Sequence, residues 1–127
     1  MSHFTRLKTQ MVELEYILRA LTDLGYEHEV GRQEVRGHGG ARTAVEVRVR
    51  TSWRGCDIGF RRAGETYDIV ADWYGVKGVS RKDFTRQVTR RYAYHAAREK
   101  LQAQGFEVVE EQEEKGGRVH LLLRRMA

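Results

Sequence analysis

The chain has 127 residues, of which 23 are Lys or Arg and 18 are Asp or Glu, so its formal net charge is +5. This length predicts a single domain over residues 1–127. One cysteine excludes an internal disulfide, no apolar run reaches the ~18 residues of a membrane helix, and the N-terminus lacks the apolar segment of a secretory signal. We therefore expect a cytoplasmic protein that does not span a membrane.

The basic excess has two interpretations. It is typical of proteins that bind an anionic partner such as RNA, DNA or an acidic protein surface. The acidic residues, however, are interspersed with the basic ones along the whole chain. This mixing favours ordinary solubility of an arginine-rich protein.

The first predicted element is an amphipathic helix over residues 9–24, ended by Gly25. Its apolar residues recur at intervals of three and four: Met11, Leu14, Leu18, Leu21 and Leu24. A weak strand is expected over residues 26–36. The segment Arg36-Gly37-His38-Gly39-Gly40 is glycine-rich like a phosphate-binding loop, but no Gly-Lys-Ser/Thr follows it and the next element is a strand. We interpret it as a hairpin turn.

Strands are also predicted at 43–49, 57–61 and 67–72, because apolar and polar residues alternate there. The connections are short, so residues 43–72 form an antiparallel meander. Ser80 begins a helix over residues 81–104 that Gly105 ends. A hairpin of 106–109 and 119–123 completes the chain.

The predicted fold is a two-layer α+β domain of order α-β-β-β-β-α-β-β. We expect its six strands to form one antiparallel sheet, with both helices on one face and the other face in water. Leu21-Thr22-Asp23-Leu24-Gly25-Tyr26-Glu27 is echoed 80 positions later by Leu101-Gln102-Ala103-Gln104-Gly105-Phe106-Glu107. The echo suggests an internal duplication, although a helix, a glycine and an aromatic residue before a strand also form a common local pattern.

A candidate partner surface combines the segment 72–80 with residues 90–95 of the second helix. Arginines bind carboxylates or phosphates, and tyrosines stack on flat groups. The candidate residues are Asp72, Trp73, Tyr74, Arg90, Arg91, Tyr94 and His95. In the alternative interpretation, Tyr92 enters the core, Arg91 and Tyr94 flank it, and His95 hydrogen-bonds to the sheet.

Two basic surfaces are candidates for nucleic-acid binding. Lys82, Arg86 and Arg90 recur every four residues and form a stripe on the second helix, a candidate anion contact that is also typical of a solvated helix face. The open face of the sheet combines Arg48, Arg50 and Arg61 with Trp53, which resembles an RNA-binding platform. The aromatic strand signature of an RNA recognition motif is absent.

The sequence predicts no catalytic residue, no cofactor and no metal ligand set, which favours a non-enzymatic protein. Asp57, Asp68 and Asp72 could bind a hard cation, but pairing with arginines is the simpler expectation. Cys56 is a lone small residue. An enzyme would require a closed site that joins His95 to a carboxylate such as Asp72.

Several segments together resemble one family. They are Met1-Ser2-His3-Phe4, Lys8-Thr9-Gln10, Asp23-Leu24-Gly25-Tyr26, Val35-Arg36-Gly37, Gly55-Cys56-Asp57-Ile58-Gly59-Phe60, Tyr67-Asp68-Ile69-Val70-Ala71-Asp72-Trp73, Arg91-Tyr92-Ala93-Tyr94, Gln104-Gly105-Phe106 and Leu122-Leu123-Arg124-Arg125. Over nearly its whole length the chain resembles the uncharacterised family of hypothetical chloroplast reading frame thirty-five, found in algal plastids, cyanobacteria and other bacteria. Cys56 stands where that family usually has tyrosine.

The resemblance transfers no site residue, because the family has no known function. It implies a subunit or adaptor role, with an AAA-type ATPase as the candidate protein partner. We expect a small binding or assembly subunit, monomeric or homodimeric, that uses its partner surface or a free sheet edge. The alternative is a nucleic-acid-binding accessory protein that uses the basic stripe.

Overall fold

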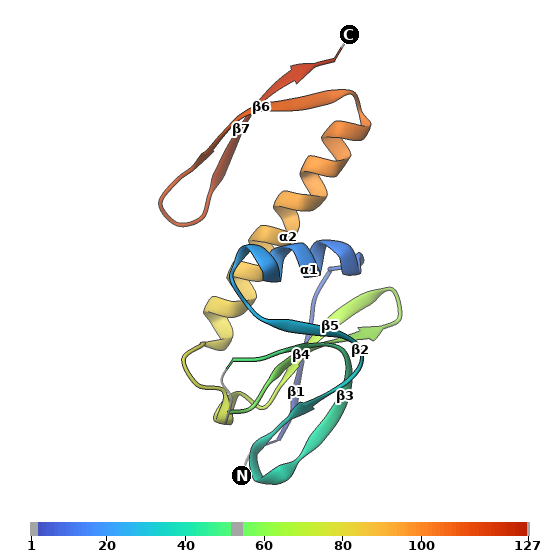
Figure 1. The fold of residues 1–127 in the computed structure, drawn as a ribbon, viewed down its shortest axis with the longest axis vertical. Helices are drawn as coiled ribbons and strands as arrows, with labels where there is room; N and C mark the ends of the chain where they lie inside the picture. The colour runs from blue at the N-terminus through green and yellow to red at the C-terminus, as the bar shows by residue number, and fades with distance from the viewer. Residues whose placement is uncertain (1–2, 52–54, 127) are drawn as a thin grey trace.

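The computed structural model describes residues 3–51 and 55–126. Two helices and seven strands follow one another as β1 (Thr5–Lys8), α1 (Leu14–Asp23), β2 (His28–Arg36), β3 (Arg42–Val49), β4 (Ile58–Ala63), β5 (Thr66–Ala71), α2 (Arg81–Ala103), β6 (Phe106–Glu113) and β7 (Val119–Arg125) (Figure 1). Two single turns of 3-10 helix lie in the loops, η1 (His38–Gly40) and η2 (Trp73–Gly75). The α+β class and the order of the predicted elements are confirmed.

The strands form two antiparallel sheets rather than one. Five strands pair in the order β1-β5-β4-β3-β2, and β6 pairs only with β7. The expectation of a single six-stranded sheet is therefore wrong. At 1.5 Å per residue, the 23 residues of α2 carry the chain about 35 Å, away from the first sheet, so the last two strands pair with each other. The unpredicted β1 occupies the edge beside β5.

Both helices cover one face of the five-stranded sheet, as predicted. Ile17, Ala20 and Leu21 of α1 and Phe84 and Val88 of α2 are fully buried there. They pack against the alternating residues of the sheet, namely Val47, Val49, Ile58, Phe60, Tyr67, Ile69 and Ala71. This shared core joins the sheet, α1 and the first half of α2.

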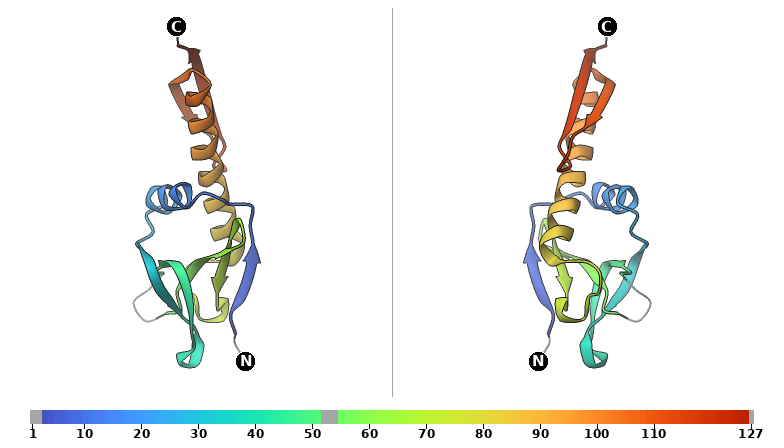
Figure 2. Two further views of the ribbon diagram at one scale, coloured as in Figure 1. Left: turned by 90° about the vertical axis from the view of Figure 1, so that its right-hand side faces the viewer. Right: turned by 90° about the vertical axis from the view of Figure 1, so that its left-hand side faces the viewer.

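The opposite face of the sheet is not open to water. The sheet curves so strongly that the β2–β3 hairpin lies opposite the β1 and β5 side (Figure 2). Val35, Val45 and Val70 are buried together in the hollow, and Phe4 packs against them. The expectation of a wet second face is wrong there, because the curved sheet encloses its own back.

α1 begins five residues later than predicted. Tyr67 N donates to Met11 O, and the buried Met11 side chain belongs to the core. The amides of Val12 and Glu13 donate to the Tyr92 hydroxyl, each at 2.9 Å. Hydrogen bonds to β5 and α2 thus engage the backbone at Met11, Val12 and Glu13 in place of a first helical turn.

The two echoed phrases adopt the same local conformation. Gly25 and Gly105 both have positive φ, 79° and 90°, and each ends a helix before a strand. The resemblance stops there, since α1 has 10 residues and leads into the large sheet, whereas α2 has 23 and leads into the hairpin. Ser80 caps α2 as predicted, because its Oγ accepts from Asp83 N at 3.0 Å.

The last part of the chain extends from the body of the molecule. Residues 96–125, which we call the arm, comprise the C-terminal part of α2 and the β6–β7 hairpin beside it (Figure 1). Within the described ranges, neither helix is both long enough and apolar enough to cross a membrane.

Candidate functional site

The predicted partner surface is divided between two parts of the molecule. In the α2 part, Arg91 and His95 both bind the Asp23 carboxylate on α1, with Nη2–Oδ2 and Nε2–Oδ2 distances of 2.8 and 2.6 Å. Partial burial alone would raise the pKa of Asp23, but the hydrogen bonds from Arg91 and His95 lower it below its usual value. These two residues hold α2 against α1.

Tyr94 and its neighbour on the next turn hold the hairpin. The Tyr94 hydroxyl and the Arg98 guanidinium both donate to Glu111 on β6. Arg91 stacks over the Tyr94 ring, with 4.2 Å between the guanidinium carbon and the ring centroid. Arg90 is exposed and lines a cavity with Gly117 at the hairpin tip. In the alternative interpretation, Tyr92 packs against the core as expected, but the hydrogen bond from His95 to the sheet is wrong, because His95 binds Asp23 on α1.

The other half of the predicted surface lies at η2. Asp72 is buried and accepts a hydrogen bond from His38 N at 2.9 Å, and Trp73 packs against Phe84. Tyr74 is 74% exposed. Because Asp72 faces His38 and His95 faces Asp23, the proton-transfer pair that an enzyme would require is not assembled.

The basic stripe is exposed as expected. Lys82, Arg86 and Arg90 line one shallow groove of about 650 Å³ with Arg81 and Leu7, and no carboxylate of the described residues lines it. Arg86 is paired with Asp83 at 3.0 Å, which reduces its charge toward a ligand. Because the stripe is exposed and its groove is basic, it remains a candidate anion contact despite this pairing.

The three arginines of the expected RNA platform all make contacts within the sheet. Arg48 is paired with Asp57, Arg50 with Glu29, and Arg61 donates to Thr43 and to Ala44 O. Trp53 lies outside the described residues. The three arginines therefore link neighbouring strands of the sheet.

The three aspartates are buried, and the expected pairing with arginines is confirmed for Asp57 and Asp68 but not for Asp72, whose carboxylate accepts from His38 N. Asp57 is wholly enclosed and bound by the Arg36 amide and guanidinium and by Arg48. Burial alone would raise the pKa of Asp57, but the Arg36 hydrogen bonds and both guanidinium charges bring it below its usual value. Asp68 binds Arg6 at 2.9 Å. No group of three or more metal-ligating side chains occurs among the described residues.

A surface that the sequence analysis did not single out is the hairpin of the arm. Leu122 is 56% exposed in the middle of β7, and Val109 and Met126 are also exposed. Among residues 3–51 and 55–126, β6 and β7 pair only with each other, so β7 presents one unpaired edge. The four aliphatic residues of β7 could have indicated this surface in the sequence. The prediction of one six-stranded sheet, however, placed them inside that sheet, where they would have been covered.

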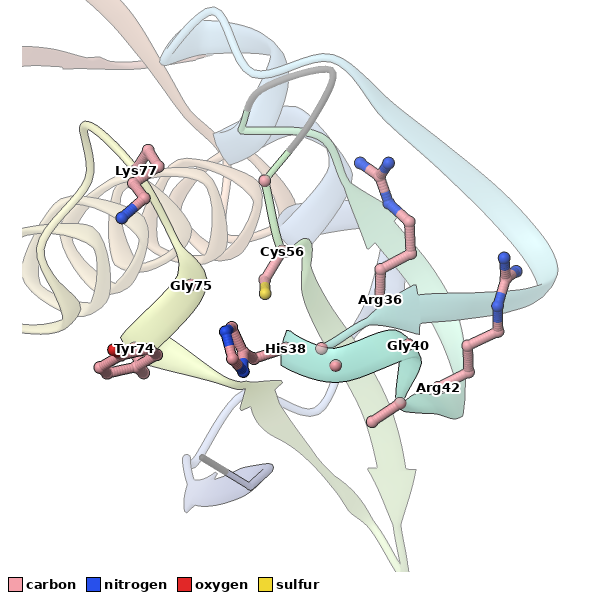
Figure 3. Close-up of a pocket in the computed structure, with 12 residues that line it drawn as sticks. Arg36, His38, Gly40, Arg42, Cys56, Tyr74, Gly75 and Lys77 are labelled. Atoms are coloured by element: carbon pink, nitrogen blue, oxygen red, sulfur yellow. The ribbon is translucent and has the colours of Figure 1, made fainter. Parts of the chain in front are cut away.

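A second missed site is a cavity of about 780 Å³ between the loops of η1 and η2 (Figure 3). The predicted hairpin turn of residues 36–40 forms one wall, the loop from Tyr74 to Lys77 forms another, and Cys56 lies between them. The β2–β3 hairpin is confirmed. The three glycines of the turn could have indicated this cavity in the sequence. Its opposite wall, however, comes from residues about 35 positions later, which local patterns do not connect to the turn.

Together the fold and these sites define a small α+β protein whose polar clusters join its elements. The chain belongs to the family described as "Protein of unknown function (DUF1257)", whose model matches residues 20–122. Its relatives include proteins named "Uncharacterized protein ycf35". The one from Guillardia theta is 30% identical over 126 residues, and that from Cyanophora paradoxa 29% over 126; each match covers 98% of both chains. No solved structure matches significantly.

Proposed function

We propose that this protein is a non-enzymatic assembly subunit and that its assembly surface is the unpaired edge of β7. The observation that carries the proposal is the exposed Leu122 at the centre of this edge. Unpaired, apolar strand edges readily add another strand, and proteins that stay monomeric usually protect them with charges. β6 carries four glutamates, whereas β7 has no charged residue between His120 and Arg124.

The exposed area of the chain supports an assembly role. The described structure has an accessible surface of 8315 Å². A compact protein of this mass exposes about 7,000 Å², so the arm leaves an excess of about 1,300 Å². A stable interface covers roughly 800 Å² on each partner, which the excess can supply.

The partner that we propose is a second copy of the chain, paired antiparallel through β7. With Leu122 on the two-fold axis, Leu121 lies opposite Leu123 of the other copy and His120 lies opposite Arg124. No arginine then faces an arginine, and the apolar residues that face α2 continue from one copy to the next. Pairing through the β6 edges would instead bring glutamates together.

Sedimentation across a range of concentrations tests the proposal. The unaltered protein should dimerise, and Leu122→Lys should remain monomeric, because it places two like charges on the axis. Gln112→Lys is the matched control, since it adds the same charge to the same hairpin but on β6. Equal dimerisation of both variants would contradict the assignment of the interface.

A crosslink locates the axis independently of stability. In a Cys56→Ser background, Leu122→Cys should form a disulfide between copies, because directly opposed residues bring their Cα atoms within bonding range. Gln112→Cys in the same background should not. A monomeric protein that instead captures an AAA-type ATPase, with capture abolished by Leu122→Lys, would overturn self-pairing and support strand addition from a different chain.

Nucleic-acid binding through the basic stripe is the second candidate, favoured by the groove that Lys82, Arg86 and Arg90 line without a carboxylate. Binding through phosphate contacts weakens with salt, with a slope of about −0.7 per neutralised phosphate on a single strand. Replacing all three residues by Gln should weaken RNA binding and make the slope shallower by roughly two units. An unchanged slope would exclude the stripe.

A further inference from the structure

We propose that an extended, acidic segment of another protein adds to the outer edge of β1 and lies in the groove between β1 and α2. This surface is on the body of the molecule, apart from the β7 edge of the arm, so the proposal does not depend on self-pairing. In the described structure β1 is an edge strand, with β5 as its one strand neighbour. Unpaired strand edges accept an extended peptide as an additional strand, held by main-chain hydrogen bonds.

The groove of about 650 Å³ lies at this edge of the sheet. α2 is on the β1 side of the sheet and α1 is on the β2 side (Figure 2). Leu7 of β1 forms one wall of the groove and the stretch of α2 from Arg81 to Arg90 forms the other, whereas no described residue of β5 lines it. The groove therefore opens on the outer side of β1. The four residues of β1 span about 13 Å and the α2 wall about 14 Å, so an added strand of that length would contact both walls.

The charge of the groove favours a segment that carries carboxylates. Arg81, Lys82 and Arg90 line the groove and have no ion-pair or hydrogen-bond partner in the described part of the chain. Arg86 is the fourth cation of the lining and is paired within α2. Lys8 adds an exposed charge at the end of β1. Carboxylates of an added strand would thus meet cations that are free to pair with them.

The lining favours a protein segment over nucleic acid or a second copy of β1. Leu7, Thr85 and Thr89 supply apolar surface, and no aromatic residue is among the described residues of the lining. Single-stranded nucleic acid is bound by cations together with aromatic side chains that stack on its bases. A second copy of β1 would bring the cations Arg6 and Lys8 of both copies together. The matching occupant is a strand in which acidic and aliphatic residues alternate.

Fluorescence anisotropy at low salt tests the proposal with a labelled peptide of alternating glutamate and valine. This peptide should bind, and a peptide of alternating lysine and valine should not. Lys82→Gln combined with Arg90→Gln should weaken binding about tenfold, because two charge-assisted pairs are lost. The matched control is Arg32→Gln combined with Lys100→Gln, which removes two exposed charges outside the groove and should not change binding. Equal loss in both double variants would overturn the assignment of the groove.

Methylated peptides test whether the segment binds as a strand. Only every second amide of an added strand faces β1. Methylation of the amide nitrogens of all glutamates or of all valines should therefore abolish binding in one case and spare it in the other. If both methylated peptides bind like the unmethylated one, strand addition is wrong.

Hydrogen exchange locates the peptide on the molecule. Bound peptide should slow amide exchange in residues 5–8. Protection of β7 instead would overturn the proposal and place the peptide on the arm. Single-stranded RNA that binds while the acidic peptide does not would also overturn it, in favour of a nucleic-acid contact by the basic stripe.

Discussion

Asp57 carries a charge with no exposed surface, at the point where β4 begins beside the end of β2. Its replacement by Asn would leave the Arg36 and Arg48 guanidinium groups without their shared carboxylate. We expect Asp57→Asn to lower the free energy of unfolding by about 3–5 kcal/mol. Urea unfolding measures it. Glu29→Gln, which breaks the half-exposed pair with Arg50, should cost less than about 1 kcal/mol. Equal costs would contradict the role of burial.

The same carboxylate predicts how stability depends on pH. Because the pKa of Asp57 is lowered in the folded protein, the unfolded chain takes up the proton first as the pH falls. The stabilisation is complete above the unfolded value of about 3.9 and is lost as the pH falls through the lower folded value. The unfolding free energies of wild type and Asp57→Asn should therefore converge below about pH 4. A constant difference down to pH 2 would exclude this linkage.

The sequence predicted the ion pairs of the buried aspartates only in part. The alternation of β4 and β5 placed Asp57 and Asp68 on the face away from Ile58 and Tyr67, and arginine pairing was expected. Their burial was not, because it depends on the curvature of the sheet. Likewise, the partner of Arg91 and His95 is Asp23, about 70 residues earlier, and local spacing cannot reveal such a contact.

Between elements, the Tyr92 hydroxyl accepts from two amides that precede α1. Tyr92→Phe should lower the free energy of unfolding by about 1–2 kcal/mol, because two donors lose their acceptor. Hydrogen exchange at Val12 and Glu13 should accelerate. Tyr16→Phe is the control, since the Tyr16 ring packs on Tyr92 while its hydroxyl has no hydrogen-bond partner among the described residues. Unchanged exchange in Tyr92→Phe would contradict this capping role.

Long periodic elements were the most predictable. The apolar stripe of α2 and its Ser80 cap gave its bounds to within one residue. β1 has four residues and one apolar side chain, Leu7, which is too little pattern to detect. The alternation of Val45 with Val47 predicted a shared face, yet Val45 joins the second core. Between Val45 and Val47, the paired strand β2 has a register shift from Val30 to Gln33. Such an irregularity bends a strand and changes the direction of its side chains.

At the scale of the whole molecule, the arm should be visible in solution. A compact 127-residue protein has a radius of gyration of about 14 Å. The monomeric Leu122→Lys variant should exceed that value in small-angle X-ray scattering, because the hairpin packs on the far part of α2 rather than on the sheet. A value near 14 Å would mean that the arm folds back. The sequence predicted both the helix and the hairpin. It did not predict that they extend from the body, because that depends on whether β6 and β7 join the first sheet or pair with each other.

The pairing of β1 with β5 has a consequence for synthesis on the ribosome. Thr5 pairs with Ala71, and the amides before α1 require Tyr92. At about 5–20 residues per second, the first strand waits roughly 3–13 s for its neighbour to be translated. During this interval Leu7 has no sheet to join. Residues 5–13 therefore wait for partners that follow much later in the chain, so the nascent chain cannot complete its core until the first half of α2 has emerged.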